Sequence, residues 1–343
     1  MTRDLTVRLS RGISLACLAG LVTQPSFAQE LNLYTTREPG LIQPLLDEFT
    51  RTTGVKVNSI FVRDGLAERV AAEGPRSPAD VLMTVDFGNL LDLVEKGLTQ
   101  PVESTVLERA IPANLRGQNG EWFALSLRAR VLYAAKDLDL SSFSYEQLGD
   151  PMWRDRVCIR SGQHPYNTAL FAAHLAHHGE DRTEAWLRGL GANLSRTAAG
   201  GDRDVARDIM GGICDIGLGN SYYVGLMRSG GGGPEQEQWG AAIKVILPTF
   251  EGGGTHVNIS GASVARHCPN RAAAVQFLEF LVSDGAQKIY AEANFEYPVK
   301  AGAAVHPIIA ALGTLQIDSL PLAEVARHRA TASKLVDMVG LDN

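Results

Sequence analysis

Short apolar runs alternate along the chain with longer stretches in which apolar residues recur every three or four positions. The runs are typical of buried β-strands and the stretches are typical of amphipathic helices. The predicted strands are 31–35, 55–62, 80–85, 130–134, 157–160, 215–218 and 242–247. The predicted helices are 41–50, 65–72, 90–96, 166–177, 203–210, 221–227, 272–281 and 285–292. Strands that alternate with helices indicate an α/β fold with a mostly parallel sheet covered on both faces.

The first 28 residues have the composition of a targeting segment rather than of a folded element. Three arginines in the first eleven residues precede an apolar run over 13–22, and small residues follow up to Ala28. An apolar run of about ten residues is far shorter than the roughly 20 that span a bilayer. The pattern predicts a signal peptide cleaved between Ala28 and Gln29, and therefore an exported, periplasmic protein.

The charge of the remaining chain argues against a nucleic-acid partner. Residues 1–28 hold three Arg and one Asp, which leaves 29 Lys+Arg against 37 Asp+Glu and a net charge of −8. Phosphate binding needs clustered Lys and Arg, whereas an acidic chain is compatible with binding cations. About 315 residues predict two domains.

Polar residues are concentrated in the loops that follow the predicted strands. In α/β folds ligands bind beyond the carboxyl ends of the strands, where such loops meet. The loop at 161–167 reads SGQHPYN and the loop at 219–223 reads GNSYY, so both place tyrosines at the start of a helix. Pro165 fits the first helical position, and Asn220 or Ser221 can cap the next helix. Tyr166, Tyr222 and Tyr223 are thus predicted in first helical turns.

Three phenols at helix starts indicate an anionic oxygen site. A free phenol ionises near pH 10, but a highly charged cation can displace its proton. Fe(III) is a hard ion that prefers anionic oxygen, whereas softer metals would call for Cys or His clusters. The histidines at 174, 177 and 178 fall in the middle of a predicted helix, where a solvated face is the simpler interpretation. Half-buried packing is the alternative for the adjacent tyrosines.

The three cysteines of the mature chain predict one bridge and one free thiol. Cys158 and Cys214 lie on strands that lead to the two tyrosine loops, so these strands are expected to be neighbours. A disulfide then forms if the Cα atoms come within about 7 Å. Cys268 precedes a proline in a loop and is the predicted free thiol.

The chain resembles the ferric-iron-binding periplasmic proteins of ABC importers, a type II periplasmic-binding-protein family. The similar segments are 31–49, 126–138, 157–167, 214–225, 256–281 and 294–299, and GNSYY is the most specific of their motifs. The resemblance implies a two-lobed α/β fold with the ligand cleft between the lobes. It implies a first lobe of 29–128 plus 258–302, and a second of 129–257 plus 303–343. Hinge strands near 128–131 and 256–259 would join them.

The resemblance also implies the ligands. Tyr222 and Tyr223 would bind Fe(III), with Tyr166 as the third ligand of one subgroup. The protein is expected to be a monomer that passes the ion to an inner-membrane ABC permease. Relatives often have a histidine just after the first strand, where this chain has Glu38; this residue could ligate or could simply begin the helix.

The anion is a second open point of the resemblance. Some relatives complete the coordination with a carbonate held by arginine. The candidates in this chain are Arg37 and Arg128, for which a surface or interlobe salt bridge is the alternative.

An organic-solute binding protein and an enzyme are the two alternatives to iron capture. A binding protein for an organic solute, such as a polyamine or a phosphonate, would use the same fold. An enzyme is not expected, because the chain has no GxSxG nucleophile motif and no GxxxxGK[ST] phosphate loop.

Overall fold

The structure is a computed structural model that describes residues 1–2 and 30–343. Most of the predicted signal peptide, with its cleavage site at Ala28, lies outside the described residues. Within them, no helix has the length and apolar character needed to cross a membrane.

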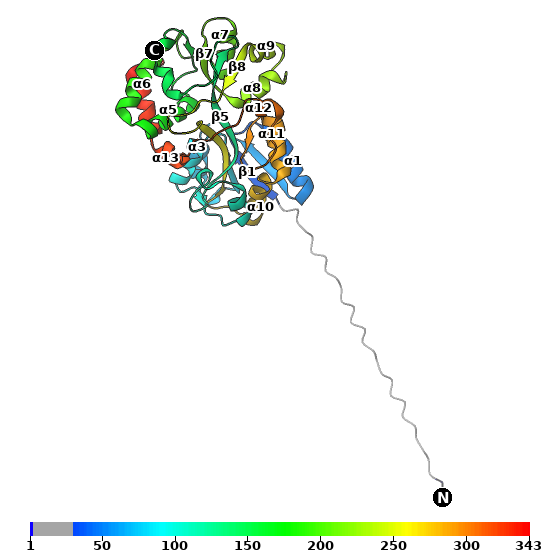
Figure 1. The fold of residues 1–343 in the computed structure, drawn as a ribbon. Helices are drawn as coiled ribbons and strands as arrows, with labels where there is room; N and C mark the ends of the chain where they lie inside the picture. The colour runs from blue at the N-terminus through cyan, green and yellow to red at the C-terminus, as the bar shows by residue number, and fades with distance from the viewer. Residues whose placement is uncertain (3–29) are drawn as a thin grey trace.

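Strand β5 (Phe123–Ala135) runs through the middle of the molecule and belongs to two sheets (Figure 1). From Phe123 to Ala129 it pairs with antiparallel strand β9 (Val257–Ala265). From Arg130 onward its partner is β7 (Ile216–Asn220), also antiparallel. The partner therefore changes within the segment 128–131 that was predicted to act as a hinge.

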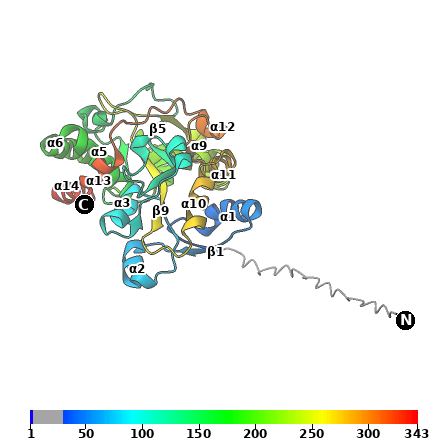
Figure 2. The same cartoon turned by 90° about the horizontal axis from the view of Figure 1, so that it is seen from below.

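The first half of the molecule is built on the strands beside β9. Its sheet has the order β2-β1-β3-β9-β5, with β1 (Glu30–Thr35) parallel to both β2 (Lys56–Phe61) and β3 (Val81–Thr84). Two short strands join its edges, β4 (Thr99–Gln100) on β9 and β10 (Tyr297–Pro298) on β5. Its helices are α1 (Pro39–Thr53), α2 (Leu66–Glu73), α3 (Phe87–Glu95), α4 (Thr105–Ala110), α10 (Arg271–Leu281) and α11 (Asp284–Asn294). Figure 2 shows α1 beside α10 and α11 on one side of β1, with α2 and α3 on the other side.

The second half is built on β7 and its neighbours. Strand β6 (Val157–Cys158) is parallel to β7, and β8 (Ile243–Ile246) is antiparallel to β5. Its helices are α5 (Pro165–His178), α6 (Glu180–Asn193), α7 (Asp202–Met210), α8 (Ser221–Arg228), α9 (Pro234–Ala242), α12 (Pro307–Ala310), α13 (Leu322–Arg327) and α14 (Arg329–Val339). Single 3-10 turns lie at Gly74–Arg76, Ala113–Leu115, Tyr145–Gly149 and Pro151–Trp153.

Every predicted strand and helix overlaps an element of the structure, but several elements were not predicted. The apolar pattern did not predict β9, of which the resemblance implied only a hinge strand near 256–259, because Asn258, Ser260 and Ser263 interrupt its apolar run; all nine of its residues are buried. The predicted strand 130–134 is only the end of the much longer β5. Helices α6 and α9 were missed because their sequences, EDRTEAWLRGLGAN and PEQEQWGAA, are mostly polar and contain glycine.

The cysteine prediction is confirmed. Cys158 and Cys214 form a disulfide with their Cα atoms 5.9 Å apart, and it ties β6 to the start of β7. Cys268 is free, and its thiol lies 3.2 Å from the Oδ1 atom of Asp80.

The expectation of a solvated histidine face on α5 is wrong. His174 is 2% exposed, stacks on Trp186 at 4.2 Å and hydrogen-bonds to Thr183. His177 and His178 are paired with Asp318 and Glu146, each at 2.7 Å. Segments distant in sequence fold over this part of α5, which periodicity within the helix does not reveal.

The burial of His174 predicts a loss of stability in acid. Burial, with the nearby His178 and His177, lowers its pKa from 6.5 to about 3. Below about pH 6.5 the unfolded chain therefore binds a proton at His174 that the folded chain does not bind. This difference lowers the free energy of unfolding by roughly 2 kcal/mol at about pH 5. Urea unfolding at about pH 7 and pH 5 should show a smaller acid loss in His174→Phe than in wild type. The exposed His267→Gln should behave as wild type, and an undiminished loss in His174→Phe would contradict the assignment.

Candidate metal centre

The three tyrosines lie in first helical turns, as predicted. Tyr166 is the second residue of α5, after Pro165 at the first position. Tyr222 and Tyr223 are the second and third residues of α8. Both helices follow strands of the second half, so all three phenols come from that half.

The predicted side-chain cap at the start of α8 is not formed. Asn220 occupies the N-cap position, but its side chain makes no capping hydrogen bond. It accepts instead from Arg130, at 3.1 Å. The Ser221 hydroxyl accepts from the backbone N–H of Ala129 and so fastens α8 to β5. Both side chains serve tertiary contacts, which the local sequence pattern could not show.

Arg130 holds the two tyrosine helices in their relative positions. Its buried guanidinium donates to Asn167, next to Tyr166, at 2.6 Å, and to Asn220, just before α8. It also forms an ion pair with Asp202 at 2.6 Å, and the Asp202 carboxylate accepts from the backbone N–H of Asn220. One cation thus connects the starts of α5, α7 and α8.

A cavity of about 460 Å³ lies between the two halves, and all six predicted site residues line it. Its lining from the first half is Thr36, Arg37, Glu38, Leu41, Val85, Ala293, Asn294, Phe295 and Glu296. Arg128 of β5 and, from the second half, Tyr166, Arg203, Tyr222, Tyr223 and Leu226 complete it. Among the six predicted site residues, the structure thus brings together Arg37 and Tyr223, which are 186 positions apart.

The phenols are close to one another and half-buried. The hydroxyl oxygens of Tyr166 and Tyr222 are 3.5 Å apart, and the ring centroids of Tyr222 and Tyr223 are 4.1 Å apart. Burial, together with Tyr166 and Tyr223, raises the pKa of Tyr222 well above 10.0, although Arg128 opposes this. Burial, Tyr166 and Asp202 likewise raise the pKa of Tyr223. Without a cation these two phenols are therefore neutral at neutral pH.

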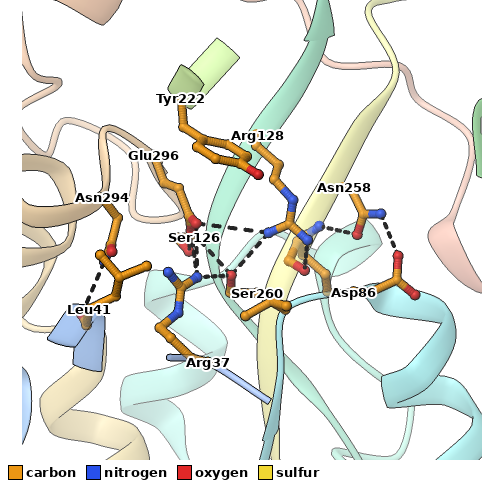
Figure 3. A network of polar contacts seen from close by, with 12 residues as sticks. Arg37, Leu41, Asp86, Ser126, Arg128, Tyr222, Asn258, Ser260, Asn294 and Glu296 are labelled. Atoms are coloured by element: carbon orange, nitrogen blue, oxygen red, sulfur yellow. Dashed lines mark hydrogen bonds and ion pairs between the residues drawn. The ribbon is translucent and has the colours of Figure 1, made fainter. Parts of the chain in front are cut away.

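Below Tyr222, Glu296 offsets part of the charge of two buried arginines (Figure 3). Arg37 and Arg128 are 3% and 1% exposed. Arg37 contacts the Glu296 carboxylate at 2.8 Å, and Arg128 lies 3.9 Å from it. Ser260 joins them, since its hydroxyl accepts from both guanidinium groups. Burial alone would raise the pKa of Glu296, but the two arginines hold that pKa below 4.5.

Both arginines keep an unused donor at this site. The Nε atoms of Arg37 and Arg128 are buried and have no hydrogen-bond partner among the described residues. Glu38, in contrast, is exposed at the N-cap of α1, at the edge of the cavity, and its side chain forms no capping bond. Arg37 and Arg128 are therefore buried residues of the cavity lining, whereas Glu38 lies at its exposed edge.

Sequence reasoning missed Glu296 and Arg203. Glu296 lies between Phe295 and Tyr297 in the segment 294–299 of the resemblance, but nothing in its local sequence pairs it with an arginine. Arg203 lies with its guanidinium carbon 5.5 Å from the Tyr223 ring centroid. Its partner is neutral Gln236, at 3.0 Å. Within residues 30–343 no group of three His, Cys, Asp or Glu side chains is placed to hold a metal, so the tyrosines carry the prediction of a metal site.

Replacing Glu296 should destabilise the fold. Glu296→Gln would leave two buried cations without their counter-charge, and breaking a buried pair in this way costs about 3–5 kcal/mol. Urea denaturation of the iron-free protein measures the loss. Glu292→Gln, four residues earlier in α11, is the control. Glu292 is 61% exposed, and its ion pair with Lys288 is long, at 3.7 Å. A loss no larger than that of the control would contradict the role given to Glu296.

The chain is similar to known proteins over most of its length. Residues 76–311 match the family model of a bacterial extracellular solute-binding protein. Iron uptake protein A1 of Synechocystis is 39% identical over 327 residues, which covers 94% of this chain and 90% of that protein. The structure of the Bordetella ferric binding protein is 63% identical, with a TM-score of 0.89 over 92% of this chain and 100% of that one. Mannheimia haemolytica ferric iron-binding protein A, in an open conformation, is 45% identical, with a TM-score of 0.87 over 92% and 100% of the two chains.

Proposed function

Because the chain belongs to the ferric-iron-binding periplasmic proteins, a non-enzymatic group of bacterial extracellular solute-binding proteins, we propose that Tyr166, Tyr222 and Tyr223 bind Fe(III) as tyrosinates. The α/β periplasmic-binding-protein fold predicted from the sequence is confirmed. The ion is the cargo of the protein, captured for uptake into the cell.

The arrangement of the phenols is the observation that supports this proposal. Three phenols from two helix starts converge on one cavity, and the hydroxyl oxygens of Tyr166 and Tyr222 lie 3.5 Å apart there. A helix N-terminus favours negative charge, so each phenolate is stabilised as it forms. Fe(III) displaces the phenolic protons and then neutralises the three negative charges.

A small anion completes the site in this proposal. Three phenolates leave coordination positions open, and a carbonate can fill them while accepting from the unused Nε donors of Arg37 and Arg128. Glu296 already offsets part of the charge of these arginines, which limits the site to an anion of low charge. Glu38 is exposed and stays a weaker candidate ligand.

We further propose that the molecule works as two lobes that close on the ion. The lobes are residues 29–128 plus 258–302, and 129–257 plus 303–343. The hinge lies where β5 changes partner and in the facing part of β9, and closure is a rotation about these strands. All three tyrosines are in the second lobe, so that lobe binds the ion first and the arginines of the first lobe arrive on closure.

The route of the ion follows from the location of the protein. A signal peptide removed after Ala28 places the mature chain in the periplasm as a monomer. There it delivers Fe(III) to the permease of an ABC importer in the inner membrane. A polyamine is a poor alternative cargo, because the carboxylates that line the cavity are the paired Glu296 and the peripheral Glu38. A phosphonate could use the arginines but leaves the grouped phenols unexplained.

A ferric-chelate titration tests the tyrosines. Tyr222→Phe and Tyr223→Phe each remove one anionic oxygen while keeping the ring, so we expect affinity to fall by more than the roughly 100-fold that loss of a supporting residue can cost. Tyr166→Phe should weaken binding, and Glu38→Gln should matter less. The readout is the visible charge-transfer band of tyrosinate–Fe(III).

Tyr297→Phe is the matched control for the tyrosine variants. The Tyr297 hydroxyl is buried and has no hydrogen-bond partner within residues 30–343, and Tyr297 does not line the tyrosine cavity, so this variant should bind iron as wild type does. Wild-type affinity in both Tyr222→Phe and Tyr223→Phe would contradict the proposal that these tyrosines bind the ion.

A further inference from the structure

Phe295 has an unusual backbone conformation at the edge of the cavity. Its φ is +54°, and among the described residues only Asp155 shares a positive φ without being glycine. A bulky residue rarely adopts this left-handed region, and such strain is kept where the surrounding structure requires it. Here the turn ends α11 and lets Glu296 return to Arg37, while the Phe295 side chain faces α8.

The Phe295 side chain occupies a space that exists because residue 225 is glycine. A Cβ atom at Gly225 would lie 2.3 Å from Phe295 Cγ and 2.4 Å from Phe295 Cβ. Gly225 is two residues after Tyr223 on the same helix. On another side the Phe295 ring meets the ring of His306, which caps α12, with centroids 4.7 Å apart. A residue of the first half is thus held against the helix that carries two of the phenols.

A second side chain, that of Arg329, also packs against a glycine of the opposite half. Arg329, the first residue of α14, lies over Gly88 of α3, where a Cβ atom would be 1.9 Å from Arg329 Nη1. Its guanidinium is 3.9 Å from both Asp86 and Asp92 of the first half. In Figure 1, α3 and α13 lie on one side of β5, and α8, α11 and α12 lie on the other. The two contacts therefore lie on opposite sides of the crossing strand.

We propose, on the basis of the Fe(III) function above, that Phe295 and Arg329 are positioning residues that hold the cavity closed around the ion. Each side chain packs against a glycine of the opposite half, Phe295 against Gly225 and Arg329 against Gly88. Both pairs bridge the two halves, one on each side of the crossing strand, so their contact energy favours the arrangement of the halves in this structure. Arg329 does not line the tyrosine cavity, so its effect on the ion is exerted through closure alone.

Iron release tests this role. The iron-loaded protein is mixed with excess EDTA, and the loss of the charge-transfer band is followed by stopped flow. Phe295→Ala and Arg329→Gln should each release iron about tenfold faster, within the 5–150-fold range of typical coupling between sites. The double variant should show roughly the product of the two effects, because the contacts share no partner. The band should stay at the wild-type wavelength, since all three tyrosines remain.

The control is Arg327→Gln, two residues before Arg329. Arg327 is 70% exposed and, among the residues that the structure describes, forms an ion pair with Glu324 of its own helix alone, so this variant should release iron at the wild-type rate. Phe295→Leu replaces Phe295→Ala if the latter does not fold, and it should give a smaller acceleration in the same direction. Release at the wild-type rate from both the Phe295 and the Arg329 variants would overturn the proposal.

Small-angle scattering separates this proposal from the assignment of the tyrosines. If wild type shows no charge-transfer band, the tyrosine ligands are wrong. The closing contacts are then judged on iron-free protein, where Phe295→Ala and Arg329→Gln should have a larger radius of gyration than wild type. Equal radii would overturn the closing role.

Discussion

The site depends on one buried cation, the guanidinium of Arg130. Arg130 is the first residue of β5 that pairs with β7 instead of β9. From that place it donates to Asn167 and Asn220 and pairs with Asp202, so it sets the distance between the two tyrosine helices. A buried charge that lost these partners would cost several kcal/mol, which makes this geometry stiff. The phenols are thus placed together before any ion arrives.

The chemistry follows from how charge is distributed around that fixed geometry. Tyr222 and Tyr223 are half-buried and uncharged without a cation, because burial and the nearby Tyr166 raise the pKa values of both. Arg37 and Arg128 contribute positive charge to the cavity, and Glu296 offsets part of it. A trivalent cation with a small anion would complete this arrangement with little net charge left in the cavity. Acid would reverse it, since protons compete with the ion for the phenolates.

Much of this could be predicted from the sequence, and the rest depends on long-range contacts. The first-turn tyrosines were predictable because Pro165 and the GNSYY segment mark helix starts. The Cys158–Cys214 bridge was predictable because Cys158 ends β6 and Cys214 lies just before the neighbouring strand β7. Glu296 was not, because its role exists only once the turn at Phe295 brings it to Arg37, 259 residues away. For the same reason the buried state of His174 and the loss of capping at Asn220 could not be inferred from their local patterns.

Resonance Raman spectroscopy of the iron-loaded wild-type protein tests the central claim most directly. Excitation within the charge-transfer band enhances vibrations only of the groups bound to the metal. If the tyrosines hold Fe(III), the spectrum will be dominated by ring modes of tyrosinate, and these will weaken in Tyr166→Phe while the remaining two phenolates still contribute. Bound iron whose spectrum contains no tyrosinate ring modes would contradict the account.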